Sequence, residues 1–140
     1  MREYSEEHVV HHFLRDDDFR GGLVLREALA AGEIVAMPAD RPMTNGKTVV
    51  TQLFERPFDL PLGPFALARA SGAAMVSAFL LREGKRRYRL VFRSPITIER
   101  TRDRAADIQG AAQRFAEDME WAIREAPYQW FCFREAWPSE

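Results

Sequence analysis

An aspartate and an arginine stand side by side as Asp40 and Arg41, shortly after the apolar run Ile34–Met37. Pro38 and Pro42 flank the pair and stiffen the backbone on both sides. An arginine placed here can grip an anionic head group through paired N–H donors, while the aspartate orients that group or a hydroxyl. A structural ion pair between two loop side chains explains the same residues equally well. Asp40 and Arg41 are therefore candidate substrate-binding residues, with both interpretations open.

Two histidine–carboxylate pairs near the N-terminus, His11 with Asp16 and His12 with Asp17, have the spacing of a base and its orienting carboxylate. Three consecutive aspartates make a chance match easy, so a solvated acidic turn after a strand is the favoured interpretation. His11 and Asp16 are kept as catalytic candidates. His8 lies with these histidines in a valine-containing run that favours a strand, and no metal site is expected there.

The composition is that of one soluble globular domain: 140 residues, 46% of them hydrophobic and 29% charged. The net charge of −1 offers no field that would attract nucleic acid, so no nucleic-acid partner is expected. The single cysteine, Cys132, excludes an internal disulfide and is interpreted as a small core residue. The first residues do not resemble a signal peptide, and the longest apolar tract, Ala66–Leu81, is too short and interrupted to span a bilayer.

The first half of the chain predicts a strand, a helix and a second strand. His8–Leu14 is the first strand, Leu23–Ala31 is a helix that ends at Gly32, and Ile34–Met37 is the second strand. A unit of this size favours a crossover connection, parallel pairing and helices over a sheet. Asp40 then follows the carboxyl end of a strand, where ligands gather in open α/β sheets.

The middle of the chain predicts further elements in quick succession. They are a turn at 44–47, a strand at 48–54, an extended loop at 58–62 with its apolar side inward, a helix from Gly63-Pro64 to Gly72, and a strand at 73–81. The last of these is almost continuously apolar, which is typical of a central strand covered on both faces.

The rest of the chain predicts a hairpin, a long helix and an aromatic tail. Met75–Arg82 pairs with Arg87–Arg93, in which aromatic and apolar residues alternate with an arginine row that is expected to be a solvated edge. Asp103–Ala126 has an apolar stripe at helical spacing and is interpreted as a packing helix. The tail Tyr128–Trp137 is expected to dock on the sheet rather than to face lipid.

The order of these blocks resembles the later half of the lysophospholipid acyltransferase superfamily, in particular the bacterial lauroyl/myristoyl acyltransferases of the lipid A biosynthesis type. The resemblance covers about Leu23 to Trp137, and the order and spacing of the blocks are more specific than any single one. The matching stretches are GEIVAMPADR at 32–41, FERPF at 54–58, LPLGPFALA at 60–68, the strands at 74–81 and 88–90, and APYQWFCF at 126–133.

The resemblance implies an α/β domain with a mixed, partly parallel sheet and flanking helices, as in glycerolipid acyltransferases. It also implies transfer of a fatty acyl group from acyl carrier protein or coenzyme A to a hydroxyl of a lipid acceptor, peripherally bound at the cytoplasmic face of the bacterial inner membrane. The thioester is a substrate, and no cofactor is expected. By the same resemblance Arg41 meets an anionic group, Asp40 lies beside it, and Phe58–Phe65 flanks the acyl chain.

The chain departs from the family at the catalytic base. The family places a histidine and, after four residues, a carboxylate well before the strand that leads to the Asp-Arg pair. Here only His11 with Asp16, or His12 with Asp17, fits, and both pairs lie too close to Asp40 and lack the glycine-asparagine-like context. From this sequence, the family's N-terminal membrane anchor is also expected to be missing.

Residues 1–140 are therefore expected to form one incomplete α/β domain that resembles the C-terminal portion of such an enzyme, with residues 1–20 poorly matched. The expectation includes a truncated or inactive remnant, which would be cytoplasmic. The alternative function is a non-catalytic α/β module that binds a lipid or a protein partner. An incomplete sheet leaves apolar faces uncovered, so self-association is expected.

Overall fold

The computed structural model describes residues 19–42, 46–132 and 136–137. The predicted strand at 8–14 and the Asn45 position of the predicted turn lie outside the described residues. The elements, in order, are α1 (Phe19–Ala30), β1 (Thr48–Leu53), β2 (Arg56–Pro61), α2 (Leu62–Ser71), β3 (Ala78–Arg82), β4 (Tyr88–Phe92), α3 (Arg104–Glu125) and the 3-10 helix η2 (Pro127–Gln129). The three predicted helices that fall in the described part of the chain are confirmed, with shifted boundaries.

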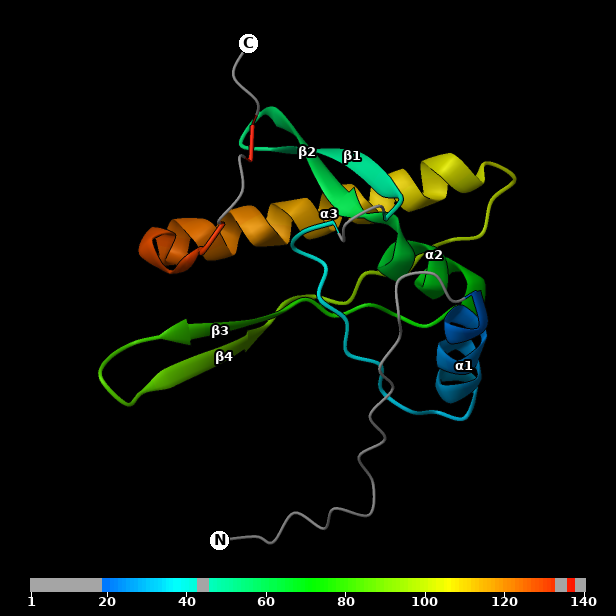
Figure 1. Ribbon diagram of the computed structural model, residues 1–140, viewed down its shortest axis with the longest axis horizontal. Coiled ribbons are helices and arrows are strands. Elements are labelled where there is room, and N and C mark those ends of the chain that lie inside the picture. The colour runs from blue at the N-terminus through cyan, green and yellow to red at the C-terminus, as the bar shows by residue number, and fades with distance from the viewer. Residues whose placement is uncertain (1–18, 43–45, 133–135, 138–140) are drawn as a thin grey trace, which may run out of the picture.

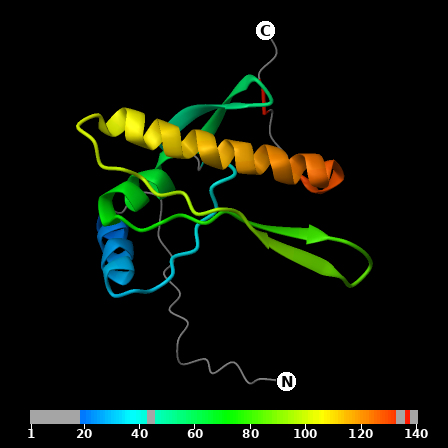
Figure 2. The same ribbon diagram turned by 180° about the vertical axis from the view of Figure 1, so that it is seen from behind.

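The described strands form two separate antiparallel hairpins, β1–β2 and β3–β4. The long helix α3 lies between them, and β3–β4 projects away from the side of the molecule that carries α1 and α2 (Figures 1 and 2). The fold is thus a small mixed α/β arrangement. The expected parallel sheet is not confirmed in the described part of the chain.

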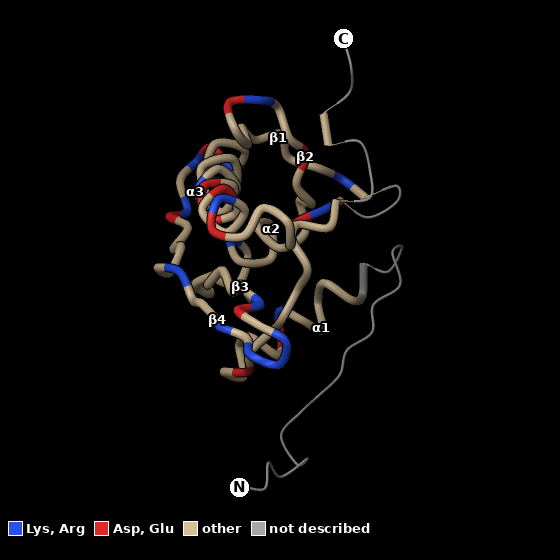
Figure 3. The backbone as a smooth tube through the Cα atoms, turned by 90° about the vertical axis from the view of Figure 1, so that its left-hand side faces the viewer, with Lys and Arg blue, Asp and Glu red and all other residues tan. Residues whose placement is uncertain are grey.

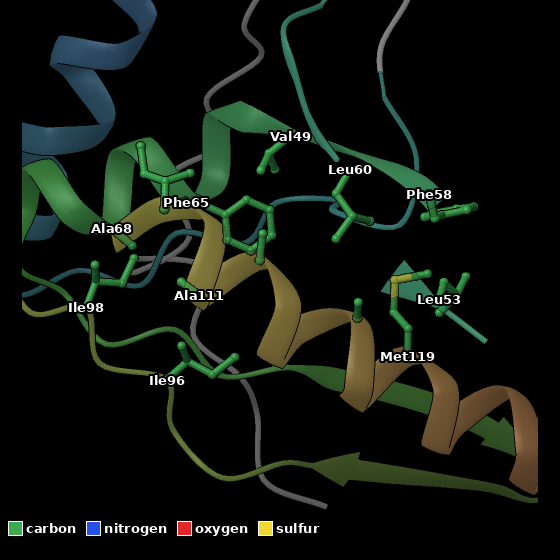
Figure 4. Close-up of a cluster of buried hydrophobic side chains, with 13 residues drawn as sticks. Val49, Leu53, Phe58, Leu60, Phe65, Ala68, Ile96, Ile98, Ala111 and Met119 are labelled. Atoms are coloured by element: carbon green, nitrogen blue, oxygen red, sulfur yellow. The ribbon is translucent and has the colours of Figure 1, made fainter. Parts of the chain in front are cut away.

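The core forms where α2 and α3 pack against the β1–β2 hairpin (Figure 4). Leu53, Leu60 and Phe65 are fully buried, and Phe58 is 2% exposed. Facing them, α3 contributes the predicted stripe, of which Ile108, Ala112 and Met119 are buried while Phe115 and Ile123 pack against the cluster as partly buried residues. The predicted burial of Phe65 and Ala68 is confirmed. This cluster holds α2 and α3 in place around the cleft described below.

Side chains of α3 also satisfy the free backbone edge of β1. Gln109 Nε2 donates to the carbonyl oxygen of Val50 at 2.6 Å. The Gln113 side chain accepts from the backbone N–H of Gln52 at 2.9 Å and donates to its carbonyl at 3.1 Å. An open strand edge is a template for pairing with another chain, so these bonds protect the edge as well as holding α3 to the hairpin.

The β1–β2 turn was missed by the sequence analysis, which predicted a loop at 58–62 where β2 is found. Phe54 and Glu55 occupy the turn with φ of 52° and 61°, a conformation in which glycine or asparagine is usual. The Glu120 carboxylate accepts from the backbone N–H of Phe54 at 2.5 Å, and Arg124 stacks on the Phe54 ring at 5.1 Å. These contacts from α3 stabilise the turn. The turn residues Phe54 and Glu55 therefore include no glycine or asparagine that would have predicted it from the sequence.

The aromatic tail docks on the β1–β2 hairpin, as predicted. The rings of Trp130 and Trp137 each lie 6.3 Å from that of Phe58, and they lie 6.1 Å from one another. Arg56 stacks on Trp137 at 5.2 Å. Cys132 in the same tail is half-buried. Trp130 and Trp137 thus cover the end of the core, whereas Tyr128 and Phe131 of the same tail are 95% and 67% exposed.

Two strand predictions are wrong. Residues 33–39, predicted as a strand at Ile34–Met37, form irregular chain, and Ile34 is 97% exposed. The predicted central strand at 73–81 is a strand only from Ala78, where it pairs with β4, and in its earlier part the only β-bridge among the described residues joins Met75 to Ile96; Leu80 is 64% exposed. A strand needs a neighbouring strand for its backbone hydrogen bonds; among the described residues the segment 33–39 has none, and β3 has only the antiparallel β4.

A carboxylate at the start of α3 ties this helix to α2. Asp107 accepts from the Thr101 hydroxyl at 2.6 Å, from the Thr101 backbone N–H at 3.0 Å and from Arg69 Nε at 2.7 Å. The bond from the Thr101 hydroxyl lowers the pKa of Asp107, burial opposes this, and Arg69 lowers the pKa further. The charged carboxylate is therefore the form that the folded protein stabilises.

Replacing Asp107 with asparagine is expected to reduce the acid sensitivity of folding. A lowered carboxyl pKa contributes stability above the ordinary value of 3.8, and this stability is lost as the pH falls through the lower pKa of the folded state. The variant should be less stable than wild type at neutral pH, and the difference should shrink in acid. Urea unfolding at a series of pH values measures this, with the exposed Glu117→Gln as control. A stability difference between the variant and wild type that does not change with pH would contradict the lowered pKa of Asp107.

Candidate functional site

A cleft of about 980 Å³ lies between the irregular segment 33–40 and the chain from 73 to 81. This volume is at the upper end of the range of ligand pockets, which is about 300–1,000 Å³. Its lining is mainly apolar, which suits a ligand with a long hydrocarbon part. Besides these two segments, the lining includes Leu29, Gly32, Pro64, Leu67, Ala68, Phe92, Phe115, Met119, Ala122, Ile123, Ala126, Gln129 and Trp130.

A glycine in the left-handed region sets the start of each wall of the cleft. Gly32 ends α1 with φ of +85°, and Gly72 ends α2 with φ of +80°. A Cβ on Gly72 would lie 2.9 Å from Arg100 Nη2, the far end of a flexible side chain that can shift, so it is the positive φ that disfavours other residues here. Beyond Gly72 the wall is fixed by the paired backbone bonds between Met75 and Ile96, at 3.0 and 2.8 Å. Both predicted helix-ending glycines are confirmed.

Asp40 lies on the border of the cleft, and Arg41 follows it. Arg41 Nη1 donates to Asp40 Oδ2 at 3.3 Å, and the two side chains are 65% and 43% exposed, respectively. An exposed ion pair of this kind contributes only about 0–1 kcal/mol, so a ligand phosphate or carboxylate can replace the aspartate at little cost. Their role as substrate-binding residues stays a prediction.

The catalytic candidates His11 and Asp16 lie outside the described residues, as do the other two histidines of the chain. Within the described ranges there is no group of three or more histidine, cysteine or acidic residues that could hold a metal ion. In the same ranges, no helix is both long enough and apolar enough to cross a bilayer. The base role of His11 stays a prediction.

The sequence analysis misplaced part of the cleft lining. It expected Phe58–Phe65 to flank an apolar ligand, but Phe58, Leu60 and Phe65 lie in the core, and only Pro64 of that stretch lines the cleft. It took α3 for a packing helix alone, whereas Met119 and Ile123 line the cleft as well. The same apolar stripe contributes to the core and to the cleft lining because α3 passes between them. Helical periodicity alone does not distinguish a core residue from a cleft residue.

The fold and cleft describe an α/β protein that can hold an apolar ligand close to an acidic and a basic side chain. Residues 13–139 match the family described as bacterial lipid A biosynthesis acyltransferase, and the chain belongs to this family. The match begins after His11 and includes Asp16, Asp40 and Arg41. A comparison with curated proteins finds no match. The predicted family resemblance is confirmed, and with it the general reaction class, which is acyl transfer to a lipid.

Proposed function

We propose that this chain serves the transfer of a fatty acyl group from acyl carrier protein or coenzyme A to a hydroxyl of a lipid acceptor of the lipid A or lysophospholipid type. The observation that carries the proposal is the large apolar cleft bordered by Asp40, in a chain of this family. The cleft takes the acyl chain, and burial of each methylene contributes about 0.8 kcal/mol to binding. We place the protein peripherally at the cytoplasmic face of the bacterial inner membrane, where both substrates meet.

In the proposed reaction, the acceptor hydroxyl attacks the thioester carbonyl and gives its proton to a general base. The carbon–sulfur bond breaks, the new ester forms, and the protonated base returns the proton to the thiolate. We assign the base to His11, oriented by Asp16, because this pair has the spacing of a base and its orienting carboxylate; His12 with Asp17 has the same spacing and is the alternative. The described residues contribute the apolar wall and the polar pair at its border.

Transfer assays with the purified chain test the proposal. Radiolabelled acyl carrier protein and coenzyme A thioesters are each supplied with a lipid A precursor or a lysophospholipid. Acylated lipid is expected with at least one pair, and none with His11→Ala. A complete lack of product with every pair would reject an active enzyme, and full activity in His11→Ala would reject His11 as the base.

Arg41→Ala is expected to lower kcat/KM about tenfold, because a charge-assisted bond to an anionic group contributes about 1.5–3 kcal/mol and this site is partly solvated. Arg41→Lys should recover part of the loss, since lysine keeps the charge but not the planar pair of donors. Initial rates at varied donor and acceptor concentrations show which substrate carries the anion. Arg26→Ala, an exposed position on α1, is the control. Equal kcat/KM values in the Arg41→Ala and Arg26→Ala variants would contradict a role of Arg41 in substrate binding.

A non-catalytic lipid-binding module is the second candidate. It is favoured by the large, mainly apolar cleft, which could hold a lipid chain without any reaction. Saturable binding of an acyl chain, together with no acyl transfer in the assays above, would support the non-catalytic lipid-binding module. Whether the chain corresponds to the C-terminal portion of a longer enzyme stays a prediction, which the reading frame upstream of Met1 tests.

A further inference from the structure

The β3–β4 hairpin is held to α3 by one face, which combines the apolar Phe79 and Leu81 with arginine side chains. Arg93 Nε donates to Asp118 Oδ1 at 2.9 Å, and its guanidinium lies 4.4 Å from the centre of the Trp121 ring. Ser77 Oγ donates to the other oxygen of Asp118 at 2.7 Å. The arginine row was expected to be a solvated edge, but Arg93 instead turns inward to pair with the helix. The prediction of a solvated row is wrong at this position because α3 supplies the acidic partners.

Further contacts fix which face points outward. Arg89 Nη2 lies 3.3 Å from a carboxylate oxygen of Glu125, and the Gln129 side chain binds both backbone groups of Arg82, at 2.7 and 3.0 Å. Phe79 packs on Trp121 with ring centres 6.3 Å apart. The hairpin is therefore attached to α3 and η2 along its length, and its outer face cannot turn toward the core without breaking these bonds.

The outer face of the hairpin is apolar and exposed. Leu80 lies opposite Leu90, and Ala78 lies opposite Phe92, so these side chains share one face with Tyr88. Leu80, Tyr88, Leu90 and Phe92 are between 55% and 65% exposed. An antiparallel hairpin on a protein surface usually has a polar face in water, whereas here the outward face is apolar, although the inward face also carries the buried Leu81 and the packed Phe79. A contiguous exposed face of this kind is typical of a surface that contacts a partner or a membrane.

Basic residues gather at the tip of the hairpin. Residues 82–89 contain five basic side chains and one acidic side chain, which gives this segment a formal charge of +4 (5 − 1) in a chain whose net charge is −1. The turn between β3 and β4 carries Lys85, Arg86 and Arg87, which Figure 3 colours blue. Glu83 pairs with Arg87 and Arg89. Among the described residues, Lys85 and Arg86 have no acidic partner.

We propose that the outer face of the hairpin docks on a bilayer of anionic lipids. The basic tip meets the lipid phosphates, Tyr88 lies at the interface, and Leu80, Leu90 and Phe92 enter the apolar layer. A second copy of the chain could cover the apolar side chains, but the basic tip directly beside them is the pairing of features that an anionic bilayer binds, so the charge favours the bilayer.

The position of the hairpin links this surface to the cleft. Leu80 and Phe92 belong to the outer face and also line the cleft. A lipid tail in the bilayer would thus reach the cleft without crossing water. This last step rests on the proposed function, whereas the docking itself does not, because it concerns only the hairpin surface and the bilayer.

Vesicle co-sedimentation of the purified chain tests the docking, without any acyl donor. Vesicles of phosphatidylcholine alone are compared with vesicles that contain phosphatidylglycerol, at about 0.1 M and about 1 M salt. Binding is expected to the anionic vesicles and to weaken at high salt. Lys85→Glu with Arg86→Glu should lower the partition coefficient by about 30-fold or more, since each basic residue near the surface contributes about a factor of five. Leu90→Ser with Phe92→Ser should have a comparable effect.

Matched controls are Arg102→Glu with Arg114→Glu, which makes the same charge change at exposed positions, and Leu23→Ser with Val50→Ser, which removes exposed apolar side chains elsewhere. All four double variants should melt close to wild type. Equal losses in hairpin and control variants, or binding that ignores lipid charge, would overturn the proposal. The proposal would also be overturned if the protein bound no vesicles and instead formed a dimer that the Leu90→Ser and Phe92→Ser changes dissociate. Vesicle binding that persists where acyl transfer fails rejects only the proposed function.

Discussion

Replacing Phe65 with alanine is expected to lower the free energy of unfolding by about 3–5 kcal/mol. The Phe65 side chain is fully buried and packs edge-on against Phe115, with ring centres 5.8 Å apart. It joins α2 to α3 and to the β1–β2 hairpin, and the cavity left by its removal cannot be filled by the closely packed neighbours. Urea unfolding followed by tryptophan fluorescence measures the loss.

Phe92→Ala is the control for this prediction, measured in buffer without lipid. Phe92 is 65% exposed, so its loss should change the unfolding free energy by about 0.5 kcal/mol or less. If Phe65→Ala cost no more than Phe92→Ala, the cluster around Phe65 would not be the core of the protein, and the placement of α2 beside the cleft would lose its support.

Replacing Ala74 with tryptophan is expected to weaken acyl-chain binding about 50-fold. Ala74 lines the cleft yet is exposed, so an indole there extends into the space proposed for the acyl chain without displacing the core. If it excludes about three methylenes, the loss is about 2.4 kcal/mol, which corresponds to that factor. The affinity is measured by titration with a fluorescent fatty acyl probe.

Ala105→Trp is the matched control, since Ala105 is exposed at the start of α3 and does not line the cleft. It should bind the probe as wild type does. An unchanged affinity in Ala74→Trp would show that the acyl chain binds elsewhere. A similar loss in both variants would show a general effect of the added indole.

Helices were the most predictable part of this fold, because their signals are local. The stripe from Ile108 to Ile123, and glycines 32 and 72 at helix ends, describe α1, α2 and α3 correctly within a few residues. The N-cap of α3 follows the same rule, since Asp103 accepts from the backbone N–H of Ala106 at 3.0 Å. Periodicity and capping act within a few turns, so the sequence alone carries them.

Strands were less predictable, because pairing depends on residues far apart in the chain. Ile34–Met37 has the composition of a buried strand but has no ladder partner among the described residues, and composition does not reveal a missing neighbour. The Phe54-Glu55 turn carries no glycine because distant residues of α3 hold it. The outward orientation of the apolar face of β3–β4 that carries Leu80 and Leu90 likewise depends on acidic residues of α3, which pair with the arginines of the other face and which the alternation within the hairpin cannot show.

The candidate site was predictable in part. Proline spacing and the apolar run drew attention to Asp40 and Arg41, and the structure places Asp40 on the border of the cleft. The cleft itself was not predictable, since its lining combines α3, the segment before Asp40 and the chain after Gly72. These segments are distant in sequence, and only the packing of α2 and α3 brings them together.

Quenching of Trp130 by a brominated acyl chain tests the central claim most directly, because bromine quenches an indole only on close contact. Trp130 lines the cleft, whereas Trp121 and Trp137 do not. We predict saturable quenching in the wild-type protein that is largely lost in Trp130→Phe. Equal quenching in the two proteins, or none in the wild type, would contradict an acyl chain in this cleft.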